Sequence, residues 1–382
     1  MANQQVVSIV RDVVILKSLL FLRSVDPVST ANDQYTSQSS RVFNRYLDFK
    51  LISASYEGNL KQVRLLIQTG ADVNARAATG ATVLMAAASS NRNAEVVMAL
   101  IHAGADVNAG DEYGATALMA AAWANPNAEV ITALIRAGAD VKASDYFGNT
   151  ALMAATQCNP NAEVITVLVR AGANVNTYDE DGEPLLICAI LYNPNVEIIT
   201  ALVREGADVN ERDLEGDTVL MFAASYNETN AEDITALVHA GADVDACTEE
   251  GWTALMMAAY SNANVEIARI LVRAGADVNT YDAERWTALM CAAQHNTNAE
   301  IITALVQEGA DVNACDEYGR TALMHAAKSN SNAEVITALL AAGCSTQIKD
   351  KNGMTALHYS KKNTHLKYLD EYWEIVDALR EC

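Results

Sequence analysis

Cysteine pairs, catalytic motifs and proline are scarce in this sequence. Seven cysteines occur without any C-x-x-C spacing, which gives neither a disulfide framework nor a zinc site. We expect reduced thiols, which favour a reducing compartment and hence the cytoplasm. The six histidines are scattered, and the sequence contains no H-E-x-x-H, nucleophile elbow or P-loop. We therefore expect no enzymatic activity, no cofactor and no metal.

Basic side chains are also few, and their shortage is confined to one part of the chain. The 382 residues carry a formal net charge of −22. Residues 70–319 contain 36 acidic and 10 basic side chains, whereas residues 1–69 and 320–382 are close to neutral, at +3 and +1. An acidic body of this kind repels phosphate-rich nucleic acid and favours a basic partner.

One short motif is abundant. The string GADVN, or a close variant, begins at nine glycines that are 34 residues apart, except for one interval of 35. These are Gly70, Gly104, Gly138, Gly172, Gly206, Gly241, Gly275, Gly309 and Gly343. A unit of this length can bury its apolar face only against a neighbouring unit, so the sequence predicts a linear array.

One copy, residues 114–147, indicates how each unit folds. Thr116 is a suitable N-cap for a short alanine-rich helix, and residues 125–127 then break the chain. Asn127 can cap a second helix with an apolar face, which ends at Gly138. The polar residues that follow are expected to form a hairpin-like loop.

This unit, with its G-x-T-x-L-x-x-A-A motif, two helices and GADVN return, resembles the ankyrin repeat over residues 46–382. The resemblance implies an all-α-dominated solenoid of about ten stacked helix-turn-helix units with hairpin-like loops and a concave inner face. We expect an N-terminal capping repeat at 46–78, eight internal repeats at 79–353 and a C-terminal capping repeat at 354–382. The histidine of the family's T-P-L-H motif is retained only at His358, so histidine bonds between repeats should be mostly absent.

Residues 1–24 form a separate segment whose apolar residues share one helical face. Charged residues interrupt this run, which makes it unlike a membrane span or an ordinary signal peptide. Three alternatives stay open: a helix that packs on the first repeat, a helix that binds a membrane surface or a partner, and an atypical signal for secretion or delivery into a host cell. Residues 25–45 are expected to be a polar linker.

Aromatic side chains occur where the repeats differ from one another, at the hairpin tips and at the ends of the first helices. The candidate partner-binding aromatics are Tyr113, Trp123, Tyr146, Phe147, Tyr192, Tyr226, Trp252, Tyr260, Trp286 and Tyr318. The candidate acidic residues of the tips are Glu112, Glu180, Asp181, Glu249, Glu250 and Glu317. In the ankyrin family these positions face the concave groove, so the resemblance implies a Tyr and Trp surface rimmed by carboxylates.

We therefore predict a monomeric protein-interaction scaffold that binds a basic segment of a protein partner through its concave face and hairpin tips. The alternative is a tethering or assembly element that residues 1–24 hold at a membrane or a larger complex. Deleting residues 1–40 distinguishes the two, because a tether loses its location whereas a binder keeps its partner.

Overall fold

The computed structural model describes residues 34–90, 93–179, 181–226, 230–261, 264–366 and 372–381. The segment 1–24 and the first part of the expected linker lie outside these ranges. The tethering alternative therefore stays a prediction. Within the described residues, no helix has both the length and the apolar character needed to cross a membrane.

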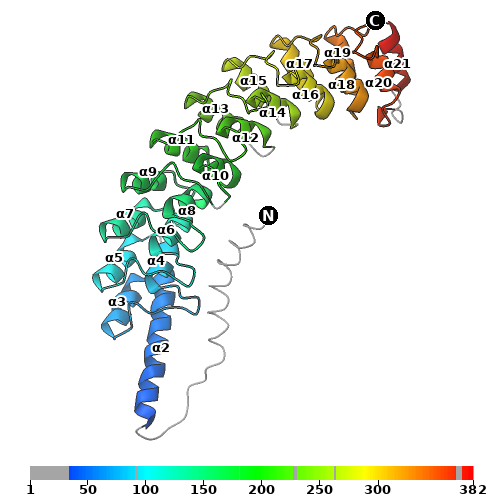
Figure 1. Cartoon of the computed structure of the whole chain (residues 1–382). Coiled ribbons are helices and arrows are strands. Elements are labelled where there is room, and N and C mark those ends of the chain that lie inside the picture. The colour runs from blue at the N-terminus through cyan, green and yellow to red at the C-terminus, as the bar shows by residue number, and fades with distance from the viewer. Residues whose placement is uncertain are drawn as a thin grey trace. The chain divides into compact units, whose positions relative to one another are not determined.

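Each repeat contributes two short helices joined by a turn, and a hairpin-like loop leads to the next repeat (Figure 1). The first helices are α2 (Gln34–Tyr56), α4 (Val83–Ser90), α6 (Ala117–Ala124), α8 (Ala151–Cys158), α10 (Leu185–Tyr192), α12 (Val219–Ser225), α14 (Ala254–Tyr260), α16 (Ala288–His295), α18 (Ala322–Ser329) and α20 (Ala356–Ser360). The second helices are α3 (Leu60–Gln68), α5 (Ala94–His102), α7 (Ala128–Arg136), α9 (Glu163–Arg170), α11 (Val196–Arg204), α13 (Ala231–His239), α15 (Val265–Arg273), α17 (Ala299–Gln307), α19 (Ala333–Ala341) and α21 (Tyr372–Glu381). The predicted helical solenoid is confirmed.

The helix boundaries follow from the predicted capping residues. The Thr116 hydroxyl accepts a hydrogen bond from the Met119 N–H at 3.4 Å at the start of α6. The Asn127 side chain accepts one from the Glu129 N–H at 3.0 Å at the start of α7. Gly138 follows α7 with a φ of 92°, a conformation that costs glycine little. All three predicted roles are confirmed.

The chain divides into two compact units. The first unit comprises the residues up to Asp181 together with Leu191–Gly206, and the second comprises Gly182–Ile190 and the residues from Ala207 on. Within each unit, first helices contact first helices and second helices contact second helices, as α6 contacts α8 in the first unit and α17 contacts α19 in the second. Each repeat thus buries its apolar surface against its neighbours.

Helix α2 differs from the sequence-based expectation. It begins at Gln34, so residues 34–45 belong to a helix and the linker predicted for this part of the chain is wrong. The physical reason is that no glycine or proline occurs between Pro27 and Gly58, so nothing in the segment breaks the helix. Leu47, Leu51 and Ala54 then anchor its C-terminal half in the first repeat, where all three are buried.

A row of buried asparagines joins the turns between the two helices of successive repeats. Asn159 is fully buried. Its Nδ2 donates to the carbonyl oxygens of Ala122 and Asn125 at 2.7 and 2.9 Å, and its Oδ1 accepts from the Asn161 N–H at 3.0 Å. Asparagines at the same position that also donate to the preceding repeat are Asn125, Asn193, Asn296, Asn330 and Asn363. These turn asparagines supply hydrogen bonds between successive repeats.

The cysteines of the described part are free thiols. Cys188, Cys291 and Cys344 are buried among apolar side chains. Burial raises the pKa of the Cys344 thiol to about 12, which disfavours the reactive thiolate. These cysteines therefore act as small core residues.

Candidate functional site

Four rings from two consecutive repeats of the second unit lie in contact with one another. Trp252 and Tyr260 make an edge contact with centroids 5.6 Å apart, and Tyr260 lies 4.3 Å from the ring of His295. Trp286 lies 6.4 Å from His295. We call Trp252, Tyr260, Trp286 and His295 the aromatic cluster.

The repeat geometry explains why these four rings meet. Trp252 and Trp286 each precede the threonine that caps a first helix, α14 or α16. Tyr260 and His295 are the last residues of the same two helices. Since α14 and α16 pack against each other, residues spaced by one repeat become neighbours. The backbone before each tryptophan has a positive φ, 90° at Gly251 and 64° at Arg285.

A hydrogen-bonded network formed by Gln294, His325 and Asp316 contacts the aromatic cluster. The carboxamide of Gln294 contacts both histidines: its oxygen lies 2.8 Å from Nδ1 of His325 and its nitrogen lies 2.9 Å from Nε2 of His295. Nε2 of the fully buried His325 donates to Oδ2 of Asp316 at 3.1 Å. The His325 ring also packs against Trp286, with centroids 4.2 Å apart. His295 and Trp286 of the aromatic cluster thus contact this hydrogen-bonded network directly.

The protonation of His325 in this network depends on its burial. Burial lowers the pKa of His325, and the hydrogen bond that His325 donates to Asp316 opposes this effect only in part. In the described geometry both ring nitrogens of His325 face an acceptor, Oδ2 of Asp316 at Nε2 and the Gln294 oxygen at Nδ1, and only a protonated ring donates to both. A neutral ring that donates from Nε2 accepts at Nδ1, and it pairs with Gln294 when the amide is turned to present its N–H groups. The orientation of the Gln294 amide therefore depends on the protonation of His325.

Asp316 holds the network together through four hydrogen bonds. Its Oδ1 accepts from the N–H groups of Tyr318 and Arg320, both at 2.8 Å. Its Oδ2 accepts from Nε of Arg320 at 2.8 Å and from His325. Burial alone would raise the pKa of Asp316, but these bonds and the charge of Arg320 outweigh it and lower the pKa to about 2. Asp316 is therefore ionised throughout the physiological range.

Accessible carboxylates lie in the hairpins beside the cluster. Glu249 and Glu250 are exposed three and two positions before Trp252, and Glu317 is exposed two hairpins further along the chain. The Glu317 carboxylate accepts a hydrogen bond from the Tyr318 phenol, which raises the pKa of Tyr318. The Arg320 guanidinium lies 4.6 Å over the Tyr318 ring and is paired with Asp316. These hairpins thus present accessible acidic side chains beside the cluster.

The other predicted residues do not join this cluster. In the first unit, Tyr113 and Phe147 are exposed neighbours with centroids 6.3 Å apart. Tyr146 is 79% exposed, but its ring lies 3.0 Å from where a Cβ on Gly114 would stand, so it also packs on the preceding hairpin. The remaining predicted residues are distributed as follows: Glu112, Asp181 and Tyr192 are exposed in the first unit, Trp123 is half-buried there, and Tyr226 is half-buried beside Phe222 in the second unit. Glu180 lies outside the described residues.

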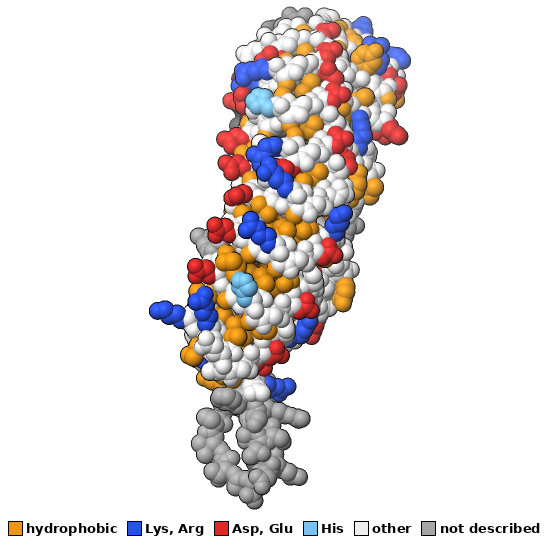
Figure 2. Space-filling view, turned by 90° about the vertical axis from the view of Figure 1, so that its left-hand side faces the viewer, with side chains coloured by type: hydrophobic (Ala, Val, Ile, Leu, Met, Phe, Trp, Pro, Cys, Tyr) orange, Lys and Arg blue, Asp and Glu red, His pale blue; other side chains and the backbone are white. Residues whose placement is uncertain are grey.

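The second helices form a face with mixed charge. Figure 2 shows basic, acidic and hydrophobic side chains interspersed along it. Basic or histidine side chains end several second helices, where they favour the negative end of the helix dipole: His102, Arg136, Arg170, Arg204, His239 and Arg273. The glutamates in the first turns, such as Glu95 and Glu129, suit the opposite end. The positions of these charged residues are explained by the stability that they give to the helix ends.

Sequence reasoning missed the roles of Gln294 and His325. His325 stands where Ala120 and Ala154 stand in α6 and α8, so a polar residue at an alanine position was the available signal for it. Gln294 lies at a variable position that is Trp123 in α6 and Gln157 in α8, and it offers no such signal. The partners could not be read from spacing alone, because Gln294 is 31 residues away in the preceding repeat.

Comparison with known proteins identifies the repeats. A family model described as ankyrin repeats (3 copies) matches residues 51–145, 124–213, 186–282, 220–316, 271–350 and 289–375. These overlapping matches cover most of the chain. No curated protein matches the sequence.

Proposed function

Because the chain belongs to the ankyrin-repeat family, whose repeats generally mediate protein–protein interaction, we propose that it is a non-catalytic scaffold that binds a basic protein segment on the aromatic cluster. The observation that carries the proposal is the cluster itself. Tyr260 is 44% exposed although it is packed against two other rings. Preorganised Tyr and Trp side chains offer a large contact area at little entropic cost, as in binding hot spots.

The charge around the cluster supports a basic partner. Glu249, Glu250 and Glu317 are accessible, whereas Arg320 is paired with Asp316 and Arg285 lies 5.3 Å over the Tyr281 ring. Lysine and arginine side chains of a partner would meet both carboxylates and aromatic faces. In the first unit, we propose that Tyr113, Phe147 and Glu112 contact the same kind of segment.

The proposal is tested by selecting binders from a library of random peptides displayed on phage, with the full-length protein as target. We expect enrichment of peptides that combine lysine or arginine with apolar residues. A parallel selection on the Tyr260→Ala variant should lose these sequences, whereas one on Tyr281→Ala should keep them. Tyr281 is a suitable control because it is an exposed tyrosine of the same unit outside the cluster. Selected peptides that are acidic, or that bind Tyr260→Ala equally well, would refute the proposal.

Binding of a selected peptide should weaken with salt. Raising the ionic strength from about 0.1 M to about 1 M shortens the Debye length from about 10 Å to about 3 Å, which screens the tip carboxylates. We expect the association rate to fall about tenfold or more, with a smaller change in the dissociation rate. Surface plasmon resonance measures both rates. An association rate that does not change with salt would show that the acidic residues do not attract the peptide.

A further inference from the structure

The asparagine of the GADVN motif joins neighbouring hairpins in a repeated way. Nδ2 of Asn108 donates to the carbonyl oxygen of Gly138 at 3.0 Å, and its Oδ1 accepts from the Asp140 N–H at 2.8 Å. The carboxamide thus bridges one backbone acceptor and one backbone donor of the next repeat. Asparagines that make the same two bonds are Asn74, Asn210 and Asn279.

This bridge is interrupted at one place in the first unit. Lys142 stands where six of the other copies have asparagine, and it lines the same hollow as Gly172 and Asn174 of the next repeat. In the described part of the chain, neither of these two backbone groups has a hydrogen-bond partner. The acceptor and donor that hold a carboxamide in the other interfaces are therefore available here.

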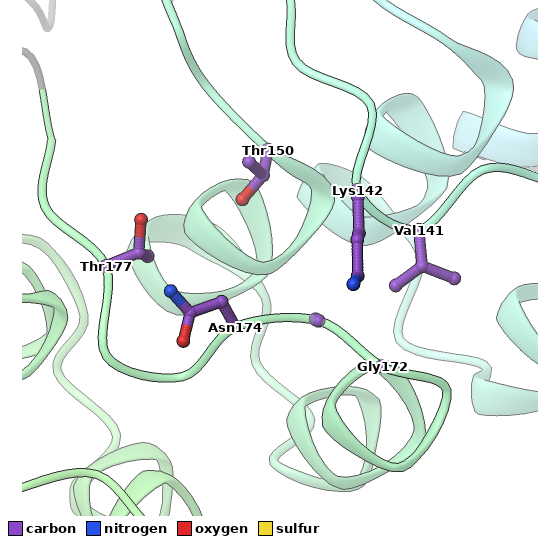
Figure 3. A pocket seen from close by; sticks show the side chains of 7 residues that line it. Val141, Lys142, Thr150, Gly172, Asn174 and Thr177 are labelled. Atoms are coloured by element: carbon purple, nitrogen blue, oxygen red, sulfur yellow. The ribbon is translucent and has the colours of Figure 1, made fainter.

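A hollow of about 520 Å³ opens at this interruption, lined by Val141, Lys142, Thr150, Gly172, Ala173, Asn174 and Thr177. Figure 3 shows the Lys142 side chain reaching toward the loop that carries Gly172 and Asn174. Asn174 also replaces the aspartate found in most copies, such as Asp106 and Asp140. The two substitutions together make the hollow more positive by two charges than the equivalent place between Asn108 and Asp140.

We propose that this hollow binds a primary carboxamide, the side chain of an asparagine or glutamine from a protein partner. Its N–H donates to the Gly172 oxygen, and its oxygen accepts from the Asn174 N–H and the Lys142 ammonium. A carboxylate fits less well, because its second oxygen would face the Gly172 carbonyl without a proton between them. A cationic side chain is repelled by Lys142. The inference is independent of the aromatic cluster, which lies in the other unit.

The test is a titration of the ¹⁵N-labelled full-length protein with acetamide, followed by amide chemical shifts. We expect a saturable shift of the Asn174 N–H signal. The Asp140 N–H should stay unchanged, because Asn108 already occupies it. N,N-dimethylacetamide, which has no N–H to donate to Gly172, should produce a much smaller shift at Asn174.

In the Lys142→Asn variant, the new asparagine side chain itself can bond to the Gly172 oxygen and the Asn174 N–H. We expect it to abolish the acetamide response and, by adding two hydrogen bonds of the kind seen at Asn108, to raise the melting temperature by about 2–4 °C. An Asn174 shift that persists in Lys142→Asn would overturn the site. The absence of any Asn174 shift in the wild type would do the same, and a larger response to acetate than to acetamide would overturn the carboxamide assignment.

Discussion

Replacing Asn159 by alanine should lower the free energy of unfolding by about 3–5 kcal/mol. The fully buried side chain satisfies two carbonyl oxygens of the preceding repeat and one N–H of its own turn. Alanine leaves these three groups without that partner, and each unsatisfied buried group costs about 1–3 kcal/mol. Urea unfolding followed by circular dichroism measures the loss.

Asn161 in the same turn is the matched control. Its Oδ1 accepts a bond from the Glu163 N–H at 3.0 Å, and its Nδ2 donates to the Pro126 oxygen at 2.7 Å, but it is only half-buried. Solvent can replace most of what Asn161→Ala removes, so we expect a loss of about 1 kcal/mol. Equal losses for the two variants would show that burial of the turn asparagines is not what joins the repeats.

Replacing His325 by alanine should cost about 3 kcal/mol. The change removes a fully buried ring packed against Trp286, leaves a cavity, and deprives the Asp316 carboxylate of one donor. Cys291→Ala is the control, because Cys291 occupies the same position of the preceding repeat and is also buried. It removes only one sulfur atom and should cost about 1 kcal/mol.

The pH dependence of stability separates the hydrogen bond of His325 from its packing. Asp316 has a folded pKa of about 2, below its ordinary value of 3.8, so its contribution is present above pH 3.8 and is lost as the pH falls toward 2. His325 has a pKa below its ordinary 6.5, so the folded state resists its protonation and stability also declines as the pH falls below 6.5. Both effects act in the same direction.

In His325→Ala, the decline below pH 6.5 should flatten, and the acid loss due to Asp316 should shrink because one of the bonds that depress its pKa is gone. Urea unfolding at about pH 7, 5 and 3 measures these slopes. A variant with the same pH profile as the wild type would indicate that the histidine acts only by filling space.

The local elements could be predicted from the sequence because each depends on residues a few positions apart. Thr116, Asn127 and Gly138 act within one turn of the helix ends they determine, and their roles are as predicted. The start of α2 was missed because polar composition suggested a linker, whereas the absence of glycine and proline decided the outcome.

The contacts between repeats were harder to predict. The turn asparagines are recognisable as turn residues, but their donors reach carbonyls 34 and 37 residues earlier, as Asn159 does to Asn125 and Ala122. The aromatic residues were singled out because the repeats of this chain differ at their positions, yet their spacing does not say which of them touch. Packing brought Tyr260 to His295 and left Tyr113 beside Phe147 in a separate unit.

The most direct test of the proposed function is the affinity of a selected basic peptide for three proteins by isothermal titration calorimetry: the wild type, Tyr260→Ala and Tyr281→Ala. The account predicts that Tyr260→Ala weakens binding about tenfold or more, as expected for an aromatic hot spot, and that Tyr281→Ala stays within about twofold of the wild type. Circular dichroism should show that both variants remain folded. Unchanged affinity for Tyr260→Ala, or equal losses in the two variants, would contradict the assignment of the aromatic cluster as the binding surface.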